Sequence, residues 1–202
     1  MKIILASESP SRKALLERLG VPFIVVPANI DEQGLIRERD IHTPKEHVMA
    51  LSKAKAQHVA SKSVPPCAII AADTVIYHNN TILEKPADEE DAFNMIKSLQ
   101  GKMHEVYTGV TIVVKGQGLC DEVTSFCDTA QVRLRLLDDS EITAYVNTGE
   151  PMGRSGSYAI NGLGSLLIDL VNGDFNTVVG LPLARTYVEL KELDIDLMEL
   201  RK

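Results

Sequence analysis

A long apolar segment in the first half of the chain reads Cys67-Ala68-Ile69-Ile70-Ala71-Ala72-Asp73-Thr74-Val75-Ile76-Tyr77, which predicts a buried β-strand. The Asn79-Asn80 pair that follows is typical of a two-residue turn and predicts a hairpin into Thr81–Lys85. Asp73 interrupts the apolar pattern, and a buried carboxylate is costly unless it meets a cation or a metal. Asp73 is therefore either a structural partner of Lys85 or a functional residue. We favour function, because further carboxylates and cations are available in the chain.

Strands and helices alternate on both sides of this segment, with glycine and proline at the breaks. Further strands are predicted at Ile3–Ala6, Pro22–Pro27, Val106–Val114, Ser125–Leu137, Ser165–Val171 and, after an Asn172-Gly173 turn, Val178-Val179. Helices are predicted from Pro10 (capped by Ser9), Pro44 (capping box Thr43 and Glu46), Asp88, Asp138 and about Leu183. The order predicts an α/β protein with a mixed sheet, because two hairpins are expected. The length suits one large domain over residues 1–202 or two closely packed lobes.

Composition and charge limit the classes of partner. The 202 residues include 28 acidic and 21 basic ones, a net charge of -7, which argues against a surface that coats nucleic acid. A nucleotide remains a suitable substrate, because a few cations in one cleft can bind a triphosphate. No apolar run has the length of a membrane span, and there is no dinucleotide-binding or Walker A motif. Cys67, Cys120 and Cys127 are an odd set without metal-site spacing, which favours reduced thiols and a cytoplasmic protein.

The segment between the first strand and the first helix is a candidate phosphate site. It contains Ser7, Ser9 and Arg12, and a helix N-terminus offers free N–H groups and a positive dipole end to a phosphate. An ordinary capped helix with a solvated Arg12-Lys13 pair explains the same residues equally well.

Lys55 is a candidate because of its place on the helix that begins at Pro44. At 100° per residue it falls on the apolar face with Val48, Leu51 and Val59, whereas Lys53 points away. A lysine on an inward face must extend to solvent, pair with a carboxylate or meet an anionic ligand, and these options stay open.

A metal site is predicted from the same set of charges. Glu32 and Glu84 add carboxylates to Asp73, and no cysteine or histidine cluster accompanies them. Oxygen ligands of this kind suit Mg²⁺ or Mn²⁺ bound together with substrate phosphates. In the expected hairpin register, Lys85 lies opposite Thr74 and beside Asp73.

The chain resembles the Maf family of septum-formation-associated nucleotide pyrophosphatases along nearly its whole length. The matching segments, in order, are Leu5–Arg12 (L-A-S-x-S-P-x-R in the family), Asp31-Glu32, Lys55-Ala56, Ala72-Asp73-Thr74, Glu84-Lys85-Pro86, Thr108-Gly109, Glu150-Pro151-Met152, Gly156–Ile160 and Val179–Pro182. One such motif would be weak, but the ordered set is specific.

The resemblance implies a two-lobed α/β fold, like that of inosine triphosphate pyrophosphatases, around an elongated mixed sheet with a central substrate cleft. It implies hydrolysis of a nucleoside triphosphate to the monophosphate and pyrophosphate with a divalent metal. By this analogy Asp73 accepts the proton of the attacking water and binds metal with Glu32. Lys55 and Lys85 take part in catalysis by holding phosphates, together with Ser7, Ser9 and Arg12.

Three positions govern base choice in the family. The dTTP/UTP type has Arg, Thr and Gln there, and the 7-methyl-GTP type has an aromatic residue, Gln and Glu. This chain has Ser11, Thr74 and Asn161, which places it nearer the dTTP/UTP type, and Gly153-Arg154-Ser155 replaces the usual Asp-Lys-Ala. The resemblance implies a substrate among dTTP, UTP or modified nucleotides, and a homodimer is compatible with it.

Two other functions fit the same residues. One is a non-catalytic nucleotide-binding regulator of cell division, although a binder needs no base such as Asp73. The other is a house-cleaning enzyme that acts on modified or damaged nucleotides.

Overall fold

The computed structural model of the chain describes residues 1–116 and 121–201. Its strands are β1 (Lys2–Leu5), β2 (Phe23–Val25), β3 (Cys67–His78), β4 (Thr81–Leu83), β5 (Met103–Lys115), β6 (Glu122–Leu134) and β7 (Ile168–Asn172). Its α-helices are α1 (Pro10–Arg18), α2 (Glu32–Glu38), α3 (Pro44–Lys62), α4 (Glu89–Leu99), α5 (Asp139–Val146), α6 (Phe175–Val179) and α7 (Leu183–Glu192). Two 3₁₀ helices, η1 (Ser155–Ser157) and η2 (Leu163–Leu167), lie between α5 and β7.

The strands form one seven-stranded mixed sheet in the order β2-β1-β3-β5-β6-β7, with β4 paired to β3. β1 runs parallel to both β2 and β3, whereas β4 is antiparallel to β3 and β7 is antiparallel to β6. The α/β class and the mixed sheet predicted from the sequence are confirmed. Within the described part of the chain, no helix combines the length and apolar composition that crossing a bilayer would require.

The chain divides into two compact units. Unit 1 contains Met1–Asp73, Thr108–Asp128 and Gly180–Lys202, and unit 2 contains Thr74–Tyr107 and Thr129–Val179. Three boundaries fall within the long strands β3, β5 and β6, each of which contributes residues to both units, and a fourth follows the end of α6 at Val179.

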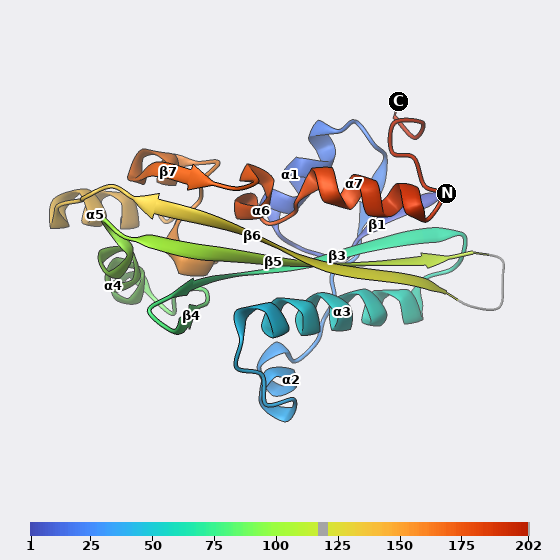
Figure 1. The fold of residues 1–202 in the computed structure, drawn as a ribbon, viewed down its shortest axis with the longest axis horizontal. Helices are drawn as coiled ribbons and strands as arrows, with labels where there is room; N and C mark the ends of the chain where they lie inside the picture. Colours follow the sequence, from blue (N-terminus) through green and yellow to red (C-terminus); the bar gives the residue numbers. More distant parts are fainter. Residues whose placement is uncertain (117–120, 202) are drawn as a thin grey trace. The chain divides into compact units, whose positions relative to one another are not determined.

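Unit 1 places α3 on one face of its strands and α7 on the other (Figure 1). The face toward α3 is built from alternate strand residues, since successive side chains of a strand point to opposite faces. Its buried cluster is Ile4, Ala6, Ala56, Val59, Ala60, Cys67, Ile69, Ala71 and Val113. Asp73 continues the series Cys67, Ile69, Ala71 and is therefore directed toward the same helix.

Unit 2 packs α4 and α5 around its own apolar core. The buried side chains of that core include Ile96 and Leu99 of α4, Ile142 and Val146 of α5, and Val132 of β6. The helix predicted from Asp138 is present as α5 and begins with a capping box. Asp138 accepts a hydrogen bond from the Glu141 N–H, and the Glu141 carboxylate accepts one from the Asp138 N–H.

Two segments differ from the prediction. The strand expected at Val178-Val179 is instead part of α6, because the Asp174 carboxylate accepts hydrogen bonds from the Asn176 and Thr177 N–H groups, both at 3.1 Å, and caps a helical turn. The prediction of a second hairpin, at the Asn172-Gly173 turn, is therefore wrong. The helix α2 was not predicted, since Gly34 interrupts its pattern and none of its residues is buried.

The cysteines agree with the prediction of free thiols where they are described. Cys67 is buried, Cys127 is half-buried, and neither forms a disulfide. The prediction for Cys120 lies outside the described residues.

Candidate active site

A buried ion pair in unit 1 joins two of the residues predicted from the sequence. The Lys55 ammonium donates a hydrogen bond of 2.6 Å to Asp73 Oδ1 and lies 3.1 Å from Glu32 Oε1. Lys55 is 9% exposed and Asp73 is 8% exposed, whereas Glu32 is exposed to solvent. Of the alternatives left open for Lys55, the structure shows pairing with carboxylates, and the partner of Asp73 is Lys55 rather than Lys85.

Local structure explains how the three residues meet. Asp73 lies on the face of β3 that α3 covers, and Lys55 is adjacent to Ala56 in the apolar stripe of that helix. The Asp31 carboxylate caps α2 by accepting the Gly34 N–H at 2.9 Å, which places Glu32 in the first helical position.

The helix α3 can approach the sheet closely because β5 carries a glycine beneath it. A Cβ atom at Gly109 would lie 2.5 Å from the carbonyl oxygen of Val48, a backbone atom of α3. A larger residue would therefore displace the helix that carries Lys55.

The first strand and helix bring a second cation to this unit. Arg12 donates from Nε to the Gly180 carbonyl at 2.8 Å and from Nη1 to Ser7 Oγ at 3.2 Å. Burial lowers the pKa of Arg12, and the carboxylates of Asp73 and Glu32 oppose that shift. Arginine remains protonated at neutral pH in any case, so Arg12 supplies a fixed positive charge close to those carboxylates.

The hydroxyls of Ser7 and Ser9 accept hydrogen bonds within the same turn. Ser7 is 9% exposed, and its hydroxyl accepts the Ser9 N–H at 3.2 Å as well as the Arg12 guanidinium. Ser9 is the N-cap predicted for α1, with its hydroxyl accepting the Arg12 N–H at 3.5 Å. These contacts keep two hydroxyls and one guanidinium together at the N-terminus of the helix.

Lys85 lies in unit 2 and is not on a strand, contrary to the expected register. Ile76 pairs with Leu83 and β4 ends at that residue, before the position opposite Thr74 is reached. The Glu84 carbonyl instead accepts a hydrogen bond of 3.0 Å from the Gly156 N–H, which draws the chain out of the ladder. Lys85 is exposed in the segment that follows.

The three positions linked to base choice have different environments. Thr74 is half-buried, and its carbonyl accepts a hydrogen bond of 2.9 Å from the Ser155 hydroxyl, a residue at which the chain departs from the family pattern. Asn161 is exposed in the turn between η1 and η2. Ser11, in unit 1, is only 5% exposed, so a long side chain would not fit there without rearrangement.

The donor set of unit 1 fits a divalent cation of the magnesium type. Asp73 and Glu32 each place an oxygen within 3.1 Å of one point, the Lys55 Nζ atom. No group of three or more Asp, Glu, His or Cys residues that could hold a metal occurs in the described ranges. Mg²⁺ is commonly held by one or two carboxylates together with substrate phosphates and water, so two carboxylates are sufficient donors.

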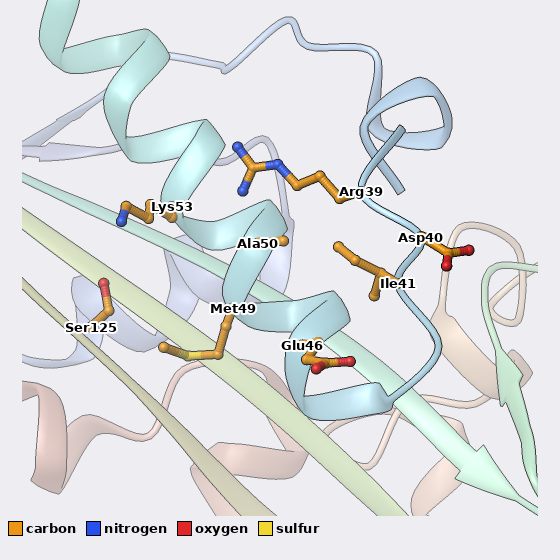
Figure 2. A pocket seen from close by; sticks show the side chains of 8 residues that line it. All are labelled: Arg39, Asp40, Ile41, Glu46, Met49, Ala50, Lys53 and Ser125. Atoms are coloured by element: carbon orange, nitrogen blue, oxygen red, sulfur yellow. The ribbon is translucent and has the colours of Figure 1, made fainter. Parts of the chain in front are cut away.

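A pocket of about 440 Å³ lies elsewhere in unit 1 and has different walls. It is lined by Arg39, Asp40, Ile41, Glu46, Met49, Ala50, Lys53 and Ser125 (Figure 2). Lys53 is two residues from Lys55 and hence about 200° away around α3. The lining includes none of the residues predicted for the site, so this pocket is separate from the Lys55–Asp73 pair.

The chain is similar to known proteins over nearly its whole length. The model of the Maf family, described as Maf-like protein, matches residues 2–193. The chain belongs to the Maf family. A Clostridium perfringens protein named dTTP/UTP pyrophosphatase is 40% identical over 198 residues, which cover 98% of this chain and 100% of the relative. An Agathobacter rectalis protein of the same name is 43% identical over 207 residues, covering 96% of this chain and 98% of the relative.

Among solved structures, a nucleoside-triphosphatase / dITP/XTP pyrophosphatase from Mycobacterium abscessus aligns with a TM-score of 0.44 and 14% identity, over 96% of each chain.

One contact in this region could not have been read from the sequence. The Gly180 carbonyl holds Arg12 across a separation of 168 residues, and no local pattern links the two positions. Its only sequence signal is that Val179–Pro182 belongs to the matching segments.

Proposed function

We propose that this Maf family protein is a nucleoside triphosphate pyrophosphatase, with UTP or dTTP as substrate, that releases the monophosphate and pyrophosphate. The observation that carries the proposal is the contact of the buried Lys55 ammonium with Asp73 and Glu32. The names of relatives at about 40% identity over almost the whole chain support the same reaction and the same pyrimidine substrates. The substrate would be a free nucleotide of the cytoplasm.

Asp73 is the base of the proposed reaction. Lys55 donates a hydrogen bond to Oδ1, which leaves the second oxygen available to accept the proton of the attacking water. The water oxygen bonds to the α-phosphorus while Asp73 takes a proton. The bond from the α-phosphorus to the oxygen that bridges it to the β-phosphorus breaks, and pyrophosphate leaves with that electron pair.

Cations at the site bind the phosphates and stabilise the charge that develops on them. We assign this role to Arg12, Lys55 and the hydroxyls of Ser7 and Ser9 in unit 1, and the family resemblance adds Lys85. Asp73 and Glu32 are the residues that would hold a divalent cation, Mg²⁺ or Mn²⁺. When bound, such an ion polarises the phosphate oxygens and lowers the pKa of water.

Replacing Asp73 with Asn tests this proposal. The substitution is nearly isosteric but removes the base, so kcat should fall about 10²–10⁴-fold while binding of a non-hydrolysable triphosphate persists. Asp40→Asn is the matched control, because it makes the same change at an exposed carboxylate whose partner is His42.

The variant leaves the Lys55 ammonium with one carboxylate partner fewer, so folding is checked by circular dichroism. Asp73→Glu provides a second variant that keeps the charge but moves the oxygens by one methylene, and it should also lose activity. Near-normal turnover by a folded Asp73→Asn protein would refute Asp73 as the base. A wild-type protein that binds UTP without hydrolysing it would instead indicate a non-catalytic regulator.

A further inference from the structure

The Glu150 carboxylate is surrounded by hydrogen-bond donors in unit 2. Its Oε1 atom accepts from the Tyr145 hydroxyl at 2.9 Å and from the Gly164 N–H at 2.8 Å. Its Oε2 atom accepts from the Leu163 N–H at 2.8 Å. The Tyr145 oxygen in turn accepts from the Ala159 N–H at 3.2 Å. One carboxylate and one phenol therefore hold the backbone at both ends of residues 159–164.

Glycine is required where this loop passes over the carboxylate. A Cβ atom at Gly162 would lie 2.3 Å from Glu150 Oε2, and one at Gly164 would lie 2.8 Å from the Tyr145 hydroxyl oxygen. The backbone therefore lies in direct contact with the two side chains that hold it, and no side chain could be inserted between them.

Asn161 lies at the centre of the loop, two residues after Ala159 and two before Leu163. It is exposed, and its carboxamide forms no hydrogen bond with other residues in the described part of the chain. A carboxamide both donates and accepts, so its orientation decides which base edge it can match. The orientation depends on a backbone that Glu150 and Tyr145 fix.

We propose that Glu150 is a positioning residue for base selection, which acts by holding the backbone of residues 159–164 so that Asn161 meets the base in one orientation. Tyr145 supports it by orienting the carboxylate and by binding the Ala159 N–H. The proposal rests on the proposed function in one respect, the assumption that Asn161 contacts the base of a nucleoside triphosphate. Hydrogen bonds to an ionised carboxylate are shorter and stronger than neutral ones, which suits a loop that must keep one conformation.

Glu150→Gln tests the positioning role with little change in shape. The carboxamide keeps one acceptor oxygen, but its NH₂ group cannot accept from a backbone N–H, so at least one loop contact is lost. Tyr145→Phe removes the phenolic contacts from the other side. Glu89→Gln, in the exposed first turn of α4, is the matched control.

Two measurements separate positioning from a purely structural role. Native-state hydrogen exchange followed by NMR should show about tenfold faster exchange of the Leu163 and Gly164 amides in Glu150→Gln, and faster exchange of the Ala159 amide in Tyr145→Phe. Binding of α,β-methylene analogues of UTP and GTP, measured by calorimetry, should show the preference between the two falling about fivefold or more in both variants and not in Glu89→Gln. Asn161→Ala should produce the same loss of preference.

Faster exchange with an unchanged preference would overturn the proposal, because the contacts would then only stabilise the loop. Unchanged exchange would overturn it as well, since the loop would not depend on Glu150. An unchanged preference in Asn161→Ala would show that the base is not read here. The binding assay needs no turnover, so failure of the pyrophosphatase reaction would be recognised separately by the lack of pyrophosphate from UTP.

Discussion

At the scale of single residues, the Lys55–Asp73 pair combines a high desolvation cost with a good hydrogen bond. Removing one partner of a buried pair typically costs about 3–5 kcal/mol, whereas replacing both with apolar residues is often neutral. A buried pair is thus weak support for a stabilising role. Glu32 and Arg12 add one further charge of each sign nearby, a surplus of polar groups that is expected of a binding site rather than of a core.

The burial of His104 predicts how the stability of the folded protein depends on pH. Its side chain is 2% exposed, and its Nε2 atom lies 2.8 Å from the Tyr158 hydroxyl. Burial, and to a lesser degree repulsion by His78, lowers the pKa of His104 to about 4. An unfolded histidine has a pKa near 6.5, so between pH 6.5 and about 4 the unfolded chain binds a proton that the folded chain does not.

The stability that depends on neutral His104 is therefore complete above pH 6.5 and is lost as the pH falls to about 4. The loss amounts to roughly 3 kcal/mol at most. Urea unfolding at pH 7, 5.5 and 4.5 should show this decline, and His104→Gln should have a shallower decline over the same range. Equal slopes for the two proteins would contradict the assignment of the effect to His104.

Sequence reasoning succeeded for residues whose burial conflicts with their chemistry. Asp73 in an apolar strand and Lys55 on an apolar helix face were both expected to need partners, and they are each other's partner. Lys85 was misplaced because counting from the Asn79-Asn80 turn assumes that the ladder continues. The contact of Glu84 with Gly156 ends the ladder early, and a contact over 72 residues leaves no signal in the hairpin.

At the scale of elements, most boundaries followed from local chemistry. Caps at Ser9, Thr43, Asp88 and Asp138 are all present, since capping depends only on neighbouring residues. The helix α6 was not predicted, because the β-branched residues Thr177, Val178 and Val179 favour a strand. In the structure, the cap that Asp174 provides outweighs that preference.

The close packing of α3 on β5 leads to a prediction about Gly109. In Gly109→Ala, the added methyl group would meet the Val48 carbonyl, so α3 must move away from β5 and take Lys55 with it. Overpacking of this kind costs roughly 1–3 kcal/mol, and turnover should fall as well. Urea unfolding and steady-state kinetics check both effects. Wild-type stability and activity in this variant would show that the close approach is not needed.

In the whole molecule, the residues predicted for the site are divided between the two units. Ser7, Ser9, Ser11, Arg12, Glu32, Lys55 and Asp73 belong to unit 1, whereas Thr74, Lys85 and Asn161 belong to unit 2. The family match over residues 2–193 includes both units. The ordered motifs identified these residues in the sequence. The contacts that individual residues make, such as that of Arg12 with the Gly180 carbonyl, could be found only in the folded chain.

In the proposed reaction, water attacks the α-phosphorus of a nucleoside triphosphate. The direct test is to hydrolyse UTP in water enriched in oxygen-18. The products are separated by chromatography, and their masses are measured by mass spectrometry. We expect UMP that carries one heavy oxygen, together with unlabelled pyrophosphate. Heavy oxygen in the pyrophosphate, or UDP and orthophosphate as the first products, would contradict it.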